Sequence, residues 1–388
     1  MKIKKASNSK MIKAINEKSI LNLIYMEGPI PRVKLAEKTG LSQQTITNIV
    51  NRLLSERIVL ETSGVSNGGG RKPIPLIING RNMYAIGIEI AVKYIRGTLM
   101  DFENNIITES IEQVPIYRDE EQPLKYIFRV VERLLEFVPN REALKGIGCS
   151  IQGIVDSENG IVVYAAGVRL NNFPLKEKIQ EHFGYPVYLQ NDANLLAIVE
   201  NLNGTLASSR QNITLKFDYG IGGAAVVNKQ LVHGADNVAF EFGHYKAFMG
   251  KEAYPCHCGS KGCLTTLASL SGLKRNEGYL LEEFSLGVRE KNKQALQLFG
   301  KLESAISYAI ANVITLLNPD HVLLTGQIID TLTDELVPLL EQHVRELIPE
   351  SCKKVKLIQL SKTPDESKLA VGLVMHEFFA VPIDQYYL

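Results

Sequence analysis

The first eighty residues carry apolar positions at helical spacing, broken by glycines. Residues 11–27 hold spaced isoleucines and leucines and stop before Gly28, and residues 32–39 form a second, shorter run closed by Gly40. Ser42 precedes a third run, where a serine hydroxyl can accept the free N–H groups of a helix start. The pattern predicts three helices, with Gly40 in the left-handed position after the second.

The third run separates an apolar face from a polar face. The apolar positions recur every three to four residues, as Ile46, Ile49, Val50, Leu53 and Leu54. The opposite face carries short, uncharged, hydrogen-bonding side chains, namely Gln43, Gln44, Thr47, Asn48 and Asn51. Such side chains can read base edges in a major groove, so we predict that this helix is a recognition helix, with Gln43, Gln44, Thr47 and Asn48 contributing most to specificity.

Two strand-like runs follow, at residues 58–60 and 75–78, on either side of a glycine-rich loop. They predict a β-hairpin wing, in which Gly68–Gly70 lets the backbone approach DNA. Arg71 and Lys72 would then contact phosphates or the minor groove. The helices and the wing together predict a winged helix-turn-helix, although three-helix units also mediate protein contacts.

Charge divides the chain in the same place. The net charge is only +1, yet residues 1–80 hold 13 lysines and arginines against 5 acids, and the remainder holds 30 against 37. A basic head on an acidic body indicates that the head meets a polyanion, which favours DNA. A charged surface without a partner is the alternative.

Composition is that of an ordinary globular protein. The 388 residues are 45% hydrophobic and 22% charged, which suggests two or three domains. No window approaches the roughly 18 uninterrupted apolar residues of a membrane span. The N-terminus lacks the apolar core and cleavage site of a signal peptide. We therefore expect a cytoplasmic protein without a membrane partner.

From Tyr84 the pattern changes to strands. Residues 85–90, 95–100 and 104–115 read as three strands, followed by a helix over 121–137 and a strand over 146–151. This order of elements predicts an α/β fold for the body of the chain.

A second chemical feature lies further along. A strand over 187–190 runs into Asn191 and Asp192, and a helix follows. A carboxylate at the C-terminal end of a strand lies where α/β folds place their chemistry, although Asp192 could also be a simple helix cap. Between two strands of residues 213–227, the glycines of 220–223 predict a tight hairpin or a turn that cradles phosphate.

One imidazole and three thiols fall within twenty residues. The spacing is His-x11-Cys-x-Cys-x4-Cys, formed by His244, Cys256, Cys258 and Cys263. These residue types match the closed ligand set of structural zinc, so we predict a Zn²⁺ site. A reduced cysteine cluster or a disulfide is the alternative, and His257 competes with His244 as the fourth ligand. The isolated Cys149 and Cys352 read as ordinary buried residues.

Several of these motifs occur in an order that resembles the ROK family, which unites bacterial sugar kinases with sugar-responsive repressors. The matching segments are Asn191–Asn194, Gly220–Gly223, His233–Ala235, Glu241–His244 and Cys256–Cys263. The N-terminal wing resembles the repressor branch. The resemblance implies a winged helix-turn-helix at 1–80, followed by a two-lobed, actin-like (ribonuclease-H-like) sugar kinase fold. The lobes would span 81–195 and 196–388, the second holding the zinc site and a dimer interface.

The resemblance also assigns roles to single residues. Asp192 matches the general base that accepts a proton from a sugar hydroxyl, and Asn191 matches an amide that binds a hydroxyl. Glu241 matches a hydroxyl acceptor. His244 matches a residue that binds zinc through one nitrogen and can face sugar with the other, and Asn171 lies where the family often contacts sugar.

The sequence departs from the kinase pattern where ATP would bind. The first phosphate loop reads Glu89-Ile-Ala-Val-Lys93 without its glycines, the second begins Asp218-Tyr219, and the adenosine-side pair is Gly326-Gln327. Side chains at such positions prevent close backbone approach to phosphate. On the sugar side, Thr265 stands where the family commonly has glutamate.

We therefore predict a sugar-responsive repressor without kinase activity. It would bind operator DNA as a homodimer or homotetramer and hold a monosaccharide or derivative in the cleft between its lobes, whose closure would move the DNA-binding heads. The retained Asp192 keeps open an active sugar kinase with a fused DNA-binding domain. The altered Thr265 keeps open a repressor controlled by a protein partner.

Overall fold

The structure, a computed structural model, describes residues 8–63, 74–115, 117–360, 362 and 364–380. The chain forms two compact units, and each is described separately. The first unit comprises Met1–Cys149, Leu175–Tyr188 and Ala370–Leu388, and the second comprises Ser150–Pro174 and Leu189–Leu369. The sequence boundaries predicted at residues 80 and 195 stay predictions.

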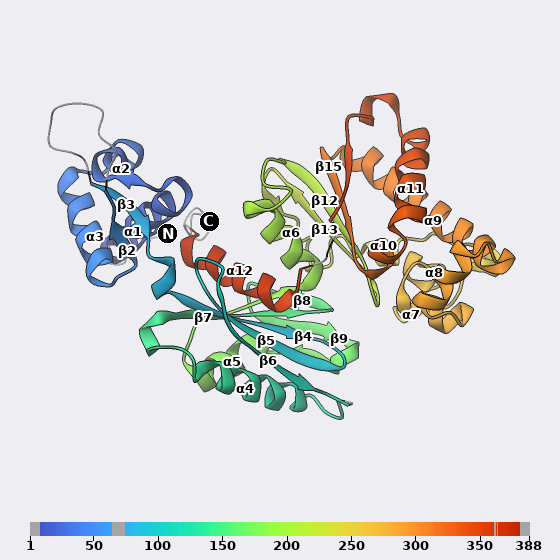
Figure 1. Cartoon of the computed structure of the whole chain (residues 1–388), viewed down its shortest axis with the longest axis horizontal. Helices are drawn as coiled ribbons and strands as arrows, with labels where there is room; N and C mark the ends of the chain where they lie inside the picture. Colours follow the sequence, from blue (N-terminus) through green and yellow to red (C-terminus); the bar gives the residue numbers. More distant parts are fainter. Residues whose placement is uncertain (1–7, 64–73, 116, 361, 363, 381–388) are drawn as a thin grey trace, which may run out of the picture. The chain divides into compact units, whose positions relative to one another are not determined.

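The first unit begins with the three predicted helices (Figure 1), which are α1 (Asn8–Glu27), α2 (Arg32–Thr39) and α3 (Gln43–Ser55). Gly40 ends α2 with φ 68°, and its N–H bonds the carbonyl of Ala36. The Ser42 hydroxyl accepts the N–H of Thr45 at 3.2 Å, which caps α3. Both terminal signals predicted from the sequence are therefore confirmed.

A small sheet completes this part of the unit. Its strands are β1 (Ile30–Pro31), β2 (Val59–Glu61) and β3 (Pro75–Ile78), arranged in the order β1-β3-β2. The antiparallel pair β2–β3 confirms the two strands predicted for the wing. The two-residue strand β1 was not predicted, because a strand that short shows no alternation. Helices and sheet share a core of fully buried side chains that includes Ile20, Leu35, Ile46, Leu53 and Leu76.

The larger sheet of the first unit follows the predicted strand pattern. Its five strands are β4 (Tyr84–Ile90), β5 (Tyr94–Asp101), β6 (Ile106–Gln113), β7 (Leu144–Ile151) and β11 (Val187–Asn191). Their order is β11-β7-β4-β5-β6. Helix α4 (Gln122–Leu135) packs on it through a buried face that includes Ile127, Val130 and Leu134, and α5 (Leu175–Phe183) contacts α4.

The first turn of helix α12 (Glu366–Phe379) belongs to the second unit, and the rest of the helix belongs to the first. In the first unit its C-terminal end packs on α1. The rings of Tyr25 and Phe379 stack with centroids 4.0 Å apart. The Asn22 amide donates to the Phe379 carbonyl at 3.1 Å. The C-terminal end of α12 therefore helps to hold the winged helix within this unit.

The second unit has its own five-stranded sheet, made of β12 (Gln211–Phe217), β13 (Ile221–Val227), β14 (Gln230–Leu231), β15 (His321–Thr325) and β16 (Lys356–Gln359). Its order is β14-β13-β12-β15-β16. If the five strands of each large sheet are numbered along the chain, their spatial order in both sheets is third, second, first, fourth, fifth. The two lobes therefore repeat one topology, as the predicted actin-like fold requires.

Helices surround this sheet. They are α6 (Asp192–Asn203), α7 (Leu270–Gly272), α8 (Leu281–Arg289), α9 (Lys293–Leu317), α10 (Gln327–Thr331) and α11 (Thr333–Leu347). Helices α9 and α11 pack together over a core that includes Phe284, Leu302, Ile306, Leu336 and Leu340. A three-stranded sheet, β8 (Ile154–Asp156), β9 (Ile161–Ala165) and β10 (Leu170–Phe173), belongs to the same unit. None of the described helices is long and apolar enough to cross a membrane.

A pair of glycines tests the packing. A Cβ on Gly148 in β7 would lie 2.0 Å from the carbonyl oxygen of Ala370, whereas one on Gly300 in α9 would meet nothing within 4 Å. We expect Gly148→Ala to lower the free energy of unfolding by about 1–3 kcal/mol through overpacking. Gly300→Ala should raise it by about 0.5–1 kcal/mol, because alanine favours a helix interior. Denaturant unfolding of both variants checks this, and equal midpoints would contradict the close approach of β7 to α12.

Candidate functional site

The polar face of α3 is open to solvent. Gln43, Gln44 and Asn48 are exposed and Thr47 is half-buried, while Ile46 and Ile49 lie in the core. The Gln44 amide donates to the Asn48 side-chain oxygen at 3.1 Å, which aligns two of the proposed base-reading groups. The predicted separation of faces is confirmed, and the DNA contacts themselves stay predictions. Arg71 and Lys72 lie outside the described residues.

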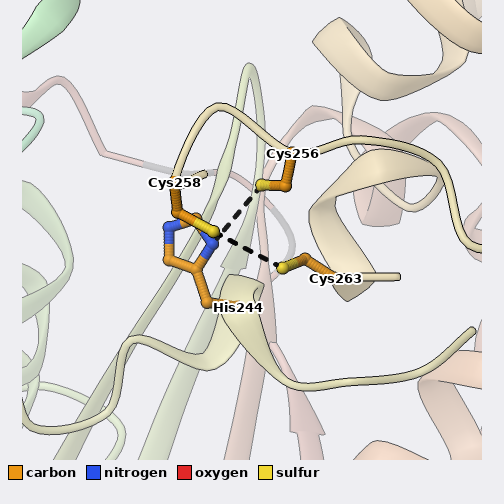
Figure 2. Close-up of side chains that lie close together, drawn as sticks. All are labelled: His244, Cys256, Cys258 and Cys263. Carbon is orange, nitrogen blue, oxygen red and sulfur yellow. Dashed lines mark hydrogen bonds between the residues drawn. The ribbon is translucent and has the colours of Figure 1, made fainter. Parts of the chain in front are cut away.

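His244 and the three clustered cysteines face one another (Figure 2). Their ligand atoms all lie within 4.8 Å of one another. Cys256 Sγ is 3.6 Å from His244 Nδ1, and Cys258 Sγ is 3.7 Å from Cys263 Sγ. A tetrahedral zinc ion with ordinary bond lengths would set these separations at about 3.6 Å for nitrogen to sulfur and about 3.8 Å for sulfur to sulfur. The donor set and its spacing therefore fit a metal ion.

The rival ligand lies close to this group. His257 Nδ1 is 3.8 Å from Cys256 Sγ, and its ring centroid is 5.1 Å from that of His244. Among the described residues, the group able to hold a metal contains His244 and the three cysteines. The residues brought together are thus the four that the sequence predicted.

Local backbone geometry makes the cluster possible. Gly259 and Gly262 have φ of 84° and 73°, which other residues adopt only with strain. A Cβ on Gly262 would lie 2.1 Å from the Phe248 carbonyl oxygen. The Lys246 ammonium donates to Cys263 Sγ at 2.8 Å, which places a positive charge beside the thiols.

His244 turns its two ring nitrogens to different neighbours. Nδ1 faces Cys256, and Nε2 lies 3.8 Å from the Glu241 carboxylate. Burial first, and then the charges of His257 and Lys246, lower the pKa of His244. A neutral imidazole is the form that binds a metal, so these surroundings suit a ligand.

Asn191 lies at the junction of β11 and α6, where it caps the helix. Its Oδ1 accepts the N–H groups of Ala193 and Asn194 at 2.9 and 3.2 Å, and its Nδ2 donates to the Gly153 carbonyl at 2.9 Å. An asparagine amide has two acceptor sites and two donor hydrogens. One N–H therefore remains to donate to a ligand hydroxyl, and the rest of the amide is committed to structure.

Asp192, the first residue of α6, is buried and bonded to Lys216. The Lys216 ammonium, on β12, lies 2.8 Å from Asp192 Oδ2 and 3.5 Å from Asp218 Oδ2, and also bonds Glu366. The Ser150 hydroxyl donates to the other Glu366 oxygen at 2.9 Å. Lys216 was not predicted from the sequence, and its position between the apolar residues Leu215 and Phe217 of a predicted strand is the signal that could have found it.

The protonation of this lysine follows from its partners. Lys216 is only 3% exposed. Burial alone lowers its pKa, but the charges of Asp192, Glu366 and Asp218 outweigh burial and raise the pKa well above the usual value. Lys216 is therefore a buried ammonium ion at every physiological pH, paired as a buried charge must be.

Asp218 also occupies the segment where the kinase pattern expects a phosphate turn. Its Oδ1 accepts the N–H of Gln327, at the start of α10, at 2.8 Å. Tyr219 beside it is 60% exposed. The following glycines serve packing, because a Cβ on Gly222 would lie 2.9 Å from the Ala193 side chain and one on Gly223 would lie 2.7 Å from Phe242. These contacts bring the first turn of α6 and the segment of Glu241 against β13.

The remaining predicted sugar residues are placed as follows. Glu241 is part-exposed, and its partial burial followed by the charge of Asp192 raises its pKa, so the two acids interact. Asn171 is an exposed residue of β10, paired with Tyr164 of β9. Thr265 is buried, and its carbonyl accepts the Ser269 hydroxyl at 2.7 Å.

Comparison with known families identifies both parts of the chain. The model of the ROK family matches residues 85–372. The chain belongs to the ROK family. A model described as winged helix-turn-helix DNA-binding matches residues 14–59, so this ROK protein carries the N-terminal module predicted from its sequence.

Similar proteins align with most of the chain. The ROK chain is 30% identical to the xylose repressor of Bacillus subtilis over 329 residues, covering 82% of this chain and 84% of that one. It is 24% identical to the DNA-binding transcriptional dual regulator NagC of Escherichia coli over 356 residues, covering 87% and 86%. A crystal structure of a ROK family transcriptional regulator, a homolog of the E. coli MLC protein, superposes with a TM-score of 0.82 at 23% identity, covering 95% and 97%. That last likeness establishes the fold.

The capping role of Asn191 gives a prediction. Asn191→Ala removes both helix caps and the bond to Gly153, and we expect it to lower the free energy of unfolding by about 1–3 kcal/mol. Asn194→Ala, on the same helix, removes a longer 3.4 Å bond to Gln190 and should cost less. Denaturant unfolding compares them, and an equal loss in the two variants would contradict the assignment.

Proposed function

We propose that this chain is a transcriptional repressor that responds to a monosaccharide or its derivative and has no kinase activity. The observation that carries the proposal is the joining of a winged helix to a ROK region whose Asp192 is bonded to a buried lysine. The names of the similar proteins, a xylose repressor and a dual regulator that binds DNA, support the same function.

The ion cluster argues against phosphoryl transfer. The Lys216 ammonium already hydrogen-bonds Asp192 Oδ2, so one oxygen of the residue that would act as general base is engaged inside the protein. The segment of the second phosphate turn carries Asp218, whose carboxylate is held by the N–H of Gln327 at 2.8 Å and opposes a phosphate group by its charge. The kinase alternative retains only Asp192 in its favour, and the contacts of that residue favour binding over catalysis.

The proposed effector site lies around the start of α6 in the second unit. Asp192 and Glu241 would accept hydroxyl hydrogens, and Asn191 would donate its remaining N–H. His244 Nε2 would face the ligand, and Asn171 stays a further candidate contact. A site built on such bonds discriminates strongly among sugars.

The proposed cofactor is a structural Zn²⁺ held by His244, Cys256, Cys258 and Cys263. Zinc would hold the loop that carries His244 and so fix the edge of the effector site. Control by a protein partner in place of sugar remains the alternative that the buried Thr265 motivates.

For DNA, we propose that α3 enters the major groove with Gln43, Gln44, Thr47 and Asn48 at its reading face. Arg71 and Lys72 of the wing would supply backbone or minor-groove contacts. A homodimer would place two winged helices on one palindromic operator, and a homotetramer could bind two such operators.

A mobility-shift assay tests the function directly. The full chain is mixed with the DNA upstream of its own gene, with and without D-xylose, D-glucose or N-acetylglucosamine. We expect specific retardation of the DNA that at least one sugar alters, because the ligand must bind one DNA-binding state more tightly than the other. Absence of DNA binding under every condition would sink the proposal.

Asp192→Asn separates sensing from DNA binding. The variant loses the charge that accepts a sugar hydroxyl, and we expect sugar affinity to fall by roughly 10- to 100-fold. Operator affinity without sugar should stay within about threefold of wild type, since Asp192 lies outside the winged helix. Glu290→Gln, an exposed acid after α8, is the matched control and should change neither quantity. A normal sugar response in Asp192→Asn would show that the site is misplaced.

The metal proposal is checked on purified protein. We expect about one zinc ion per chain, loss of zinc in Cys256→Ser, and a lower unfolding temperature after chelation. Cys352→Ser changes a buried cysteine outside the cluster and should keep its zinc. Full zinc content in Cys256→Ser would contradict the ligand assignment.

A further inference from the structure

The acids around Lys216 belong to three separate parts of the second unit. Asp192 opens α6, Asp218 lies in the turn after β12, and Glu366 opens α12. None of these contacts was visible in the motif pattern, and neither the proposed DNA binding nor the zinc site needs them. Their arrangement bears on which ligands the effector site accepts.

The lysine is paired with three acids inside the protein. An ammonium carries three N–H donors. Lys216 hydrogen-bonds Asp192 and Glu366 and forms an ion pair with Asp218, so its neighbours match its donors in number. An incoming anion would have to displace one of these carboxylates to reach the positive charge.

The charge of the cluster opposes an anion as well. One cationic and three anionic side chains leave two net negative charges in a largely buried place. Charges interact strongly where water is excluded. The other oxygen of Asp218 accepts the N–H of Gln327 at 2.8 Å, so the protein holds this negative charge in place.

A neutral hydroxyl meets a different surface. Lys216 bonds Oδ2 of Asp192, and Oδ1 has no hydrogen bond among the described residues. Oδ1 can therefore accept a hydroxyl hydrogen while Lys216 holds the carboxylate in a fixed orientation. A carboxylate held in this way presents one oxygen to a ligand hydroxyl.

We propose that Lys216 and its three carboxylates form a closed ion cluster that restricts the effector site to neutral sugars and rejects their phosphate esters. Lys216 is the positioning residue for Asp192, and Asp218 is the residue that most directly excludes phosphate. The proposal rests on the proposed function, since it names the ligand class of the same site.

Calorimetry with matched ligands tests the proposal on the full, zinc-loaded chain. The probes are D-glucose and N-acetylglucosamine, each beside its own 6-phosphate, together with D-xylose. We expect that a neutral sugar binds and that a 6-phosphate binds at least about 100-fold more weakly than its parent, or not at all. A 6-phosphate that binds as tightly as its parent, or more tightly, overturns the proposal.

Charge-removing variants attribute the selectivity to the cluster. Asp218→Asn removes one negative charge and frees capacity on Lys216, so the affinity of a 6-phosphate relative to its parent should rise by about tenfold. Glu366→Gln provides an independent test of the same kind if Asp218→Asn is unstable. Asp334→Asn, at an exposed position on α11, is the control and should leave the ratio unchanged. A purely structural cluster would leave the ratio unchanged in all three variants, which would also overturn the proposal.

The outcomes distinguish a failure of the neutral-sugar restriction from a failure of the proposed sugar-responsive function. If neither sugars nor their phosphates bind to the folded protein, the sugar-responsive function itself fails. If a phosphate ester binds and alters DNA retardation, the sugar-responsive function stands and the restriction to neutral ligands is wrong.

Discussion

The second unit is organised around one buried cation. Lys216 leaves β12 almost fully covered, and a charge in that position is tolerated only because carboxylates surround it. Those carboxylates come from the start of α6, the turn after β12 and the start of α12. The same helix α12 ends against α1 in the first unit, through the Tyr25–Phe379 stack. One helix thus takes part both in the ion cluster and in the packing of the winged helix.

Within the proposed function, this arrangement accounts for sugar binding by a kinase-type fold without catalysis. The residue that would accept a proton is kept, but its negative charge is already shared with an ammonium ion. The segment that would hold phosphate in a kinase carries Asp218, which accepts the N–H of Gln327. The zinc-type cluster keeps its four donors and turns His244 Nε2 toward Glu241, so the frame of the site persists while its chemistry has changed.

The features that could be predicted from the sequence are those encoded by a local pattern or by rare residue types. The faces of α3 follow from helical periodicity, and the four metal-type ligands follow from cysteine and histidine spacing. The strands of the first large sheet follow from short apolar runs. Lys216 was missed, because a lysine between two apolar strand residues indicates a buried charge but does not identify its partners, which are up to 150 residues away. The sequence also did not show that most hydrogen-bonding groups of the Asn191 amide cap α6 or bond Gly153, because a motif identifies a residue but not its contacts.

The central claim is that sugar and operator bind to one protein and influence each other. Linkage requires the coupling to be reciprocal, so a sugar that changes operator affinity by some factor must have its own affinity changed by the same factor when operator is present. The most direct measurement is therefore the dissociation constant of the active sugar, determined by calorimetry on the free protein and again on the protein saturated with operator. We predict two different values, whose ratio equals the effect of the sugar on DNA binding. Identical values would contradict it.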